Sequence, residues 1–151
     1  LGFNPVARDK MHITLEFFED VNEDEVEKLK KAMENVSIDD FRLEVTGVGA
    51  FPSKDYIRVV WAGAEDRKMH QLYSQVSNHS VESSNNHDFA PHITLMRVEN
   101  ISKGDKRKLR KVLDEHQGHW FGEATVGAVK LFESKLTGKG SKYSELYRKE
   151  L

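Results

Sequence analysis

The tetrapeptide His-Ile-Thr-Leu occurs twice in this chain, at residues 12–15 and again at residues 92–95. In each copy a histidine and a threonine stand two positions apart, with apolar, β-prone residues between and after them. This alternation predicts a half-buried strand, on which side chains two positions apart share one face. If the two strands lie side by side, two imidazoles and two hydroxyls share that face. Such a set of groups is suited to proton transfer around a phosphate.

Length and composition indicate one soluble, globular domain over residues 1–151, in which 38% hydrophobic residues suffice for a core with two subdomains. The formal net charge of -2 provides no cationic field for a long nucleic-acid footprint, so any RNA contact is expected to be local. The chain contains no cysteine, which suits a reducing cytoplasm and excludes thiolate chemistry. It also lacks an apolar run of the roughly 18 residues that a membrane span needs. We therefore expect a cytoplasmic monomer that does not bind a membrane.

Helical and strand patterns alternate after the first motif. Asn22, with Glu25 three residues later, forms a capping-box-like start for a helix with apolar residues at helical spacing. The patterns predict, in order, a strand over residues 11–18, this helix, strands over 41–45 and 56–61, a helix over 69–76 and a polar loop over 82–88.

A similar order follows the second motif. Ser102 opens a basic helix that ends near Gly118, residues 123–136 supply strand material, and Gly138-Lys139-Gly140 predicts a hairpin turn into residues 143–147. The repeated order predicts an α+β fold of two pseudo-symmetric lobes, each an antiparallel sheet with helices on the outside. The two motif strands are expected to line a central cleft between these lobes.

Paired histidines on neighbouring strands suit in-line displacement at phosphorus. Histidine gives and takes protons near neutral pH because its unperturbed pKa is about 6.5, so His12 and His92 can serve as general acid and general base. Thr14 and Thr94 can donate hydrogen bonds to the non-bridging phosphate oxygens. This chemistry requires no metal and no other cofactor.

Two other interpretations of the motifs stay open. A single His-x-Thr is a weak signal and is more often structural, whereas a second copy in a similar context favours catalysis. A zinc site is the sharper competitor, but threonine is a poor ligand and no carboxylate falls at the matching position of both copies. The histidines without a repeated partner are expected at surface or capping positions: His70, His79, His87, His116 and His119.

At its two motif segments the sequence resembles the 2H phosphoesterase superfamily, which is named for paired His-x-Thr/Ser motifs. Within that superfamily it is most similar to the RNA 2′,3′-cyclic phosphodiesterases, historically called 2′-5′ RNA ligases. The resemblance covers nearly the whole chain and is carried by residues 11–18, 49–52, 60–63, 91–98 and 131–146. Family members usually begin with a strand and a helix that are absent here or reduced to the eleven residues before His12. Either that element is missing, or another segment covers the strand edge that it would leave exposed.

The resemblance implies a role for each motif residue. His12 would protonate the leaving 3′ oxygen of a 2′,3′-cyclic phosphate, and His92 would activate the attacking water, which leaves a 2′-phosphate. Thr14 and Thr94 would hold the phosphate oxygens. With a 5′-hydroxyl in place of water, the same site run backward would join RNA ends. The implied substrates are RNA ends, tRNA-derived ends among them, or small cyclic nucleotides.

Three further features have a functional and a structural interpretation. Arg97 matches a family arginine and is a candidate phosphate or RNA contact, although strict alternation from His92 turns it to the opposite face, where it would be salt-bridged. Phe51 is a candidate for stacking on a nucleobase, or for closing its loop onto the core. The basic run over residues 103–111 either attracts an RNA backbone or forms a solvated helix face.

Several alternatives to an RNA cyclic phosphodiesterase remain at this stage. Related 2H enzymes would act on ADP-ribose cyclic phosphate or on 2′-5′ oligoadenylate with the same chemistry. A protein of another class, a non-catalytic RNA or nucleotide-binding module, would keep the cleft and show no turnover.

Overall fold

Each of the two units of this protein is assembled from three separate stretches of the chain. The computed structural model describes residues 2–85, 87–138 and 140–151. Unit 1 comprises Leu1–Leu15, Leu43–Asp66 and Phe89–Ala124, and unit 2 comprises Glu16–Arg42, Arg67–Asp88 and Thr125–Leu151. The predicted α+β fold with two lobes and antiparallel sheets is confirmed. The repeated order of elements suggests that each motif and the elements after it form one lobe. In the structure, each unit instead combines segments that follow both motifs.

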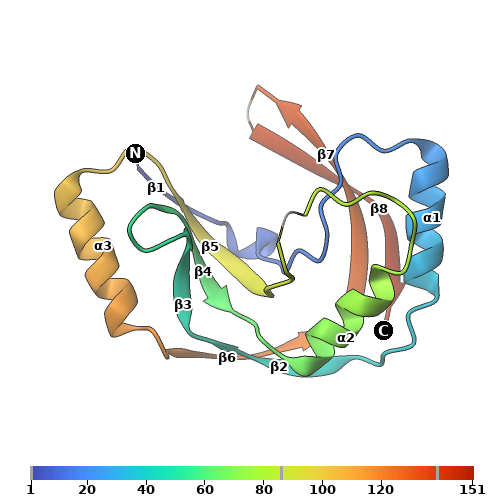
Figure 1. The fold of residues 1–151 in the computed structure, drawn as a ribbon, viewed down its shortest axis with the longest axis horizontal. Coiled ribbons are helices and arrows are strands. Elements are labelled where there is room, and N and C mark those ends of the chain that lie inside the picture. The colour runs from blue at the N-terminus through green and yellow to red at the C-terminus, as the bar shows by residue number, and fades with distance from the viewer. Residues whose placement is uncertain (1, 86, 139) are drawn as a thin grey trace. The chain divides into compact units, whose positions relative to one another are not determined.

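Unit 1 is built on a four-stranded antiparallel sheet (Figure 1). The strands lie in the order β1, β5, β4, β3, with bounds Phe3–Pro5, His92–Val98, Ile57–Gly63 and Val48–Pro52. The second motif therefore begins strand β5, as predicted, with β4 on one side of it and β1 on the other. Strand β4 pairs along the second motif from His92 to Thr94, whereas β1 pairs with β5 beyond the motif, at residues 96–98.

Helix α3, Lys103–Glu115, covers one face of this sheet (Figure 1). The predicted start is confirmed, because the Ser102 side chain accepts a hydrogen bond from the backbone N–H of Asp105 at 3.0 Å. Leu113 is buried against Val60 of β4 and Val98 of β5, and Leu109 packs beside them. The apolar side of α3 thus joins the sheet, and its other sides are left to charged residues.

The N-terminal segment covers the edge of β5 that the family comparison left exposed. Residues Phe3–Pro5 pair with β5 as β1, and the backbone N–H of Val6 donates to the carbonyl of Leu95 at 2.9 Å. A 3-10 helix, Arg8–Lys10, follows, and Ile13 then makes an isolated antiparallel bridge with Ile93. Residues 3–6 thus cover the part of this edge from Leu95 to Val98. The predicted continuous strand over residues 11–18 is wrong, because this one bridge is its β pairing.

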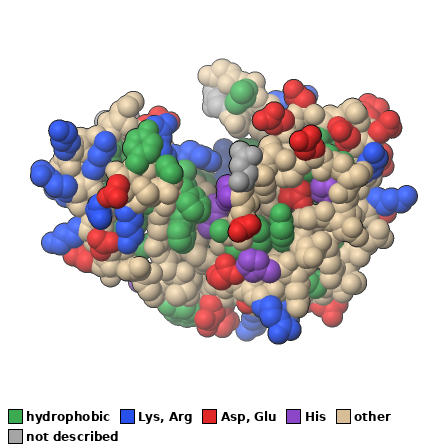
Figure 2. All heavy atoms as spheres, in the orientation of Figure 1, with side chains coloured by type: hydrophobic (Ala, Val, Ile, Leu, Met, Phe, Trp, Pro, Cys, Tyr) green, Lys and Arg blue, Asp and Glu red, His purple; other side chains and the backbone are tan. Residues whose placement is uncertain are grey.

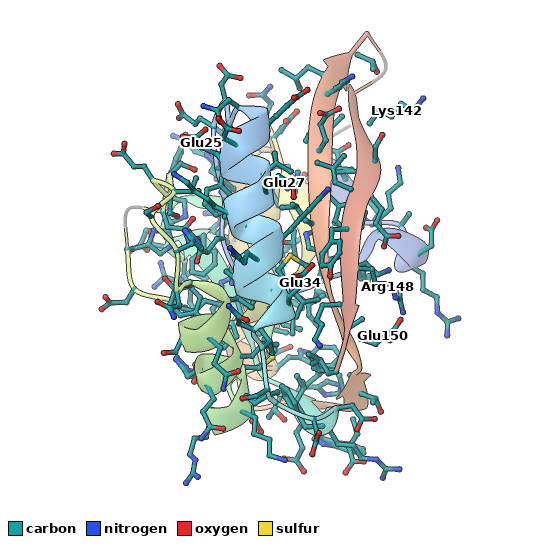
Figure 3. The ribbon with its side chains drawn as sticks, turned by 90° about the vertical axis from the view of Figure 1, so that its right-hand side faces the viewer. Glu25, Glu27, Glu34, Lys142, Arg148 and Glu150 are labelled. Carbon is teal, nitrogen blue, oxygen red and sulfur yellow. The ribbon has the colours of Figure 1, made fainter. Side chains whose placement is uncertain are left out.

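Unit 2 contains helix α1, helix α2 and a long hairpin of β7 and β8, with bounds Glu23–Glu34, Arg67–Val76, Ala128–Thr137 and Gly140–Glu150. The predicted capping box is present, since Asn22 and Glu25 each bond the other's backbone N–H. Figure 3 shows α1 lying along the hairpin, where the Tyr147 hydroxyl donates to Glu34 at 3.2 Å. Burial and the adjacent Glu34 raise the pKa of Tyr147.

The boundary between the units runs through a two-stranded sheet of β2, Phe41–Thr46, and β6, Trp120–Val126. The pattern over residues 123–136 predicts strand material, but Gly127 interrupts it and separates β6 from β7. Within the predicted loop over residues 82–88 and the predicted turn over 138–140, Asn86 and Lys139 lie outside the described residues. Among the described helices, none is long and apolar enough to cross a membrane.

Candidate active site

The two motif copies meet within unit 1. Ile13 and Ile93, the residues between histidine and threonine in each copy, form the antiparallel bridge. Side chains alternate along extended chains, so the residues that flank the bridge share the face opposite to the two isoleucines. Antiparallel pairing also places the histidine of each copy across from the threonine of the other. The prediction that the motif segments lie side by side is confirmed, while the predicted cleft between the lobes stays a prediction.

Both motif histidines are held by the same backbone contact. His12 Nδ1 lies 2.8 Å from the carbonyl oxygen of Lys10, and His92 Nδ1 lies 2.7 Å from that of Ala90. A carbonyl oxygen accepts hydrogen bonds and donates none, so Nδ1 carries the proton in each ring. In the neutral ring Nε2 is therefore the unprotonated nitrogen. The local fold thus fixes one tautomer in both copies and assigns proton exchange to Nε2.

The Nε2 atoms differ in their contacts. His12 Nε2 lies 3.1 Å from Thr14 Oγ1 within the same motif, so the hydroxyl donates to the neutral ring and accepts from the protonated one. His12 is exposed, whereas His92 and Thr94 are half-buried in β5. The two copies share a sequence and a tautomer, but they stand in different surroundings.

A β-bulge in β5 turns Arg97 to the face that carries His92 and Thr94. In the pairing with β4, Thr94 lies opposite Trp61 and Met96 lies opposite Val60, so Leu95 is the extra residue. Arg97 then pairs with Val59, which shares a face with Trp61 by the regular alternation of β4. The expectation from strict alternation, that Arg97 faces the opposite way, is wrong because the bulge shifts the phase by one residue. Arg97 is exposed on this face, and no ion pair of its guanidinium is found among the described residues.

Two aromatic rings, from strands β3 and β4, lie beside the imidazole of His92. Phe51 of β3 stands edge-on to the imidazole, with ring centroids 4.9 Å apart and planes at 81°. Trp61 of β4 lies 5.4 Å from Phe51 and 6.3 Å from His92, centroid to centroid. Phe51 is half-buried, contacts a motif residue and packs on a neighbouring ring, while its stacking on a nucleobase stays a prediction.

Trp61 is a residue that the sequence analysis did not place in the site. Its indole lies over Gly49, because a Cβ built on that glycine would stand 2.1 Å from Cζ2 of the indole. A tryptophan opposite a glycine on the next strand is a weak sequence signal for a site residue. It becomes informative only when the register that pairs Gly49 with Trp61 is known. The Nε1 atom of Trp61 is buried and has no hydrogen-bond partner within the described residues.

The remaining histidines follow the expectation with one exception. His70, His87, His116 and His119 are exposed, and His116 caps the end of α3. His79 is instead buried in unit 2, with 5% of its side chain exposed, and its Nε2 lies 3.0 Å from Oε2 of Glu16, which is equally buried. Its Nδ1 accepts from the backbone N–H of Val81, so Nε2 donates to the carboxylate. The prediction of a surface or capping position was wrong for His79.

A hollow of about 200 Å³ in unit 1 lies on the other face of the sheet. It is lined by Met11, Ala62, Ile93 and Leu95 together with residues of β2 and β6. Since Ile93 faces away from the motif histidines, this hollow is separate from the candidate site. In the part of the chain that the structure describes, no three His, Asp or Glu side chains are grouped as a metal site requires.

The comparisons with known proteins agree with this fold. The family model described as LigT like Phosphoesterase matches residues 1–61, which include the first motif. The RNA 2′,3′-cyclic phosphodiesterase of Methanocaldococcus jannaschii is 30% identical over 145 residues, which cover 94% of this chain and 81% of that protein. The class of protein is therefore a phosphoesterase of the LigT type.

Solved structures show the same fold. The crystal structure of TT0787 of Thermus thermophilus has a TM-score of 0.76 and 25% identity, covering 99% of this chain and 82% of that one. E. coli LigT complexed with 3′-AMP has a TM-score of 0.69 and 25% identity, covering 99% of this chain and 80% of that one. The chain belongs to the LigT-like phosphoesterases, the family of the RNA 2′,3′-cyclic phosphodiesterases.

Proposed function

We propose that this protein hydrolyses 2′,3′-cyclic phosphates on RNA ends or small nucleotides to 2′-phosphates, by acid-base catalysis without a metal. The observation that carries this proposal is the antiparallel meeting of the two motif copies, with the same Nδ1 contact in each. Two rings that exchange protons through Nε2, one of them neutral and the other protonated, are matched to a reaction that removes one proton and supplies another. The relative from Methanocaldococcus jannaschii carries the name of this activity.

His92 and His12 divide the proton transfers between them. Nε2 of neutral His92 takes a proton from water, whose oxygen forms a bond to phosphorus. The bond between phosphorus and the 3′ oxygen breaks on the opposite side, and protonated His12 delivers its Nε2 proton to that oxygen. The product carries a 2′-phosphate and a 3′-hydroxyl, and the ring protonation states are exchanged. Release of a proton by His92 and uptake by His12 restore the starting state.

Thr14, Thr94 and Arg97 bind the phosphate. The threonine hydroxyls donate to the non-bridging oxygens, where negative charge gathers during displacement. Arg97 shares their face because of the bulge at Leu95, and its guanidinium supplies a fixed positive charge. Phe51 contributes to substrate binding through a ring face that a nucleobase can stack on. The complex of E. coli LigT with 3′-AMP supports a nucleotide-sized ligand.

The wider assignments of the sequence analysis form part of this proposal. They are RNA ends as partners, a monomeric state and a cytoplasmic location. With a 5′-hydroxyl in place of water as the nucleophile, the same steps form a bond from that oxygen to phosphorus, break the bond to the 3′ oxygen and join RNA ends through a 2′-5′ bond. ADP-ribose cyclic phosphate and 2′-5′ oligoadenylate would use the same catalytic groups, so substrate comparison separates these activities from the one proposed.

The direct test is incubation with an RNA that ends in a 2′,3′-cyclic phosphate, followed by identification of the hydroxyl that keeps the phosphorus. We expect a 2′-phosphate. A non-catalytic binding module would leave the cyclic phosphate intact, and a 3′-phosphate product would contradict the assignment of His12 to the 3′ oxygen.

Measuring the rate in excess chelator tests whether the reaction proceeds without a metal. We expect the rate to survive excess chelator and to follow a bell-shaped pH profile around neutrality, because one imidazole must be protonated and the other neutral. A loss of activity that added zinc restores would favour the zinc interpretation of the paired histidines.

A further inference from the structure

Helix α3 carries an unusual concentration of positive charge. Residues 103–111 include six lysines and arginines and one acidic residue, Asp105. Figure 2 shows the lysine and arginine side chains gathered over α3, at the left of the view. With a net charge of -2 for the whole chain, this patch is a local feature of unit 1.

Helix α1 of the same protein shows how a merely solvated charged helix is arranged. There Glu27 precedes Lys30 and Lys31 by three and four residues, and the Glu27 and Lys30 side chains form an ion pair at 3.3 Å. Such pairs stabilise a helix by about 0.2–0.5 kcal/mol each, and like charges at the same spacing destabilise it by similar amounts. The α3 cations mostly have one another at this spacing, as Lys103 and Arg107 do. Helical stability therefore does not account for the charge pattern of α3.

The cations near the start of α3 are exposed and make no ion pair within the described residues. Lys103, Lys106 and Arg107 belong to this group, with Lys108 beside them. Farther along the helix, Arg110 pairs with Asp55 and Lys111 with Glu115. The acidic end of α3 is also engaged, because the hydrogen bond and charge of Lys54 hold the pKa of Asp114 below its ordinary value.

These cations lie in a stripe on a rigid support. Positions 103, 106 and 107 fall on one side of a helix, over a length of about 6 Å at 1.5 Å per residue. The apolar side of α3 is fixed to the sheet through Leu109 and Leu113. A fixed row of positive charges matches a flexible polyanion better than it matches a compact anion.

The stripe begins close to the candidate site along the chain. Strand β5 ends at Val98, directly after Arg97 on the site face, and α3 begins at Lys103. The short connection of residues 99–102 leads from the strand end to the other face of the sheet, which α3 covers. Arg97 on the site face and Lys103 at the start of α3 therefore lie at the two ends of one short segment, which carries one acidic residue, Glu99.

We propose that the exposed stripe of Lys103, Lys106 and Arg107 binds the phosphate backbone of the RNA chain that leads to the reacting end. This inference rests on the proposed function for the identity of the polyanion. According to this inference, α3 makes the protein prefer longer substrates. An RNA of several nucleotides gains contacts with the stripe that a cyclic mononucleotide cannot make. Binding to the stripe lowers KM for RNA and leaves the chemical step unchanged.

The test compares two substrates in one triple variant, Lys103→Gln/Lys106→Gln/Arg107→Gln. Each lost contact to a single-stranded phosphate lowers affinity by a factor of about four at about 0.15 M salt, from a slope of roughly 0.7 per phosphate. We expect KM for a single-stranded RNA of about 20 nucleotides with a 2′,3′-cyclic phosphate end to rise roughly 50-fold on that basis. The kcat for this RNA, and kcat/KM for a 2′,3′-cyclic mononucleotide, should stay within about twofold of the parent.

A matched control carries the same change of charge on α1. The variant Lys28→Gln/Lys30→Gln/Lys31→Gln removes three cations from a helix in which acidic residues stand three or four positions before the lysines. We expect its KM for RNA to rise far less than that of the α3 variant. The thermal midpoint of the α3 variant should equal or exceed that of the parent, because like-charge neighbours are removed.

Direct binding keeps this test independent of turnover. Fluorescence anisotropy with the same RNA ending in a 2′-phosphate should show the same loss of affinity and a salt slope about two units shallower in the α3 variant. An unchanged RNA affinity, or equal losses in the α3 and α1 variants, would overturn the inference. If the parent turns over neither substrate, the proposed function fails, and the anisotropy result still decides whether α3 binds RNA.

Discussion

The two copies of the His-Ile-Thr-Leu motif are identical in sequence and differ in what surrounds them. The copy at residues 92–95 lies in strand β5, paired with β4, and its histidine touches Phe51 and Trp61. The copy at residues 12–15 is attached to β5 by one bridge, and its exposed histidine contacts Lys10 and Thr14 of its own segment. Nevertheless each Nδ1 bonds the carbonyl two residues earlier.

This difference separates what the motif itself encodes from what the fold adds. The tautomer is encoded locally, because it recurs in both copies whatever the surroundings. In the second copy the fold also restrains the His92 ring, because Phe51 on β3 and Trp61 on β4 pack beside it. Two histidines of one tautomer in unlike surroundings suit the unlike tasks of acid and base.

The largest expected effect comes from removing either histidine. His12→Ala and His92→Ala should each lower kcat by about 10²–10⁴-fold, because each removes one general catalyst. Both variants should still bind a 2′-phosphate nucleotide with near-parental affinity, as measured by calorimetry. Loss of turnover in one variant and near-normal turnover in the other would contradict a catalytic role for both copies, since the histidine of one copy would then be structural.

The threonines test whether the two copies hold the phosphate in the same way. Thr14→Val and Thr94→Val should each lower kcat by roughly 10²-fold, as expected for loss of one donor to a developing oxyanion. Of the two threonines, Thr14 is the one with a hydrogen bond to a motif histidine in the described residues. Thr14→Val should therefore also shift the limb of the pH profile that depends on the catalytic acid. The serine variants at both positions serve as controls and should recover most of the rate. Identical pH profiles for both valine variants would contradict the difference between the copies.

A smaller effect, confined to His92, is expected from the aromatic cluster. Gly49→Ala places a Cβ against the indole of Trp61, which must shift among the rings around His92. We expect kcat for a cyclic mononucleotide to fall about tenfold, in the range in which small misplacement of a catalytic group is felt.

The double variant Gly49→Ala/Trp61→Phe provides the control for this effect. A smaller ring leaves room for the Cβ, so the double variant should lose less than the two single changes together. Additive losses would show that Gly49 acts on the site by another route than the indole.

Much of the fold was predictable because its signals are local. The capping box at Asn22 and Glu25 and the helix start at Ser102 depend on residues close in sequence, and both are confirmed. The second motif strand is confirmed for the same reason. The first motif has the same alternation, but it is no strand, because strand formation also needs a partner along its length.

The parts that the sequence did not reveal depend on pairing between distant segments. The phase shift that turns Arg97 to the site face arises from a bulge in the pairing of β5 with β4. The contact of Trp61 with His92 needs both this register and the glycine on β3. The burial of His79 against Glu16 joins residues far apart in the chain, and no local pattern marks it.

The central claim is that both histidines act on one phosphate from one face of one sheet. Side-chain NMR of His12 and His92 during titration with a 2′-phosphate nucleotide tests it most directly, with each ring assigned through its alanine variant. We predict that the ring signals of both histidines move together and give a single Kd. Movement of one ring while the other stays unchanged through saturation would contradict the claim.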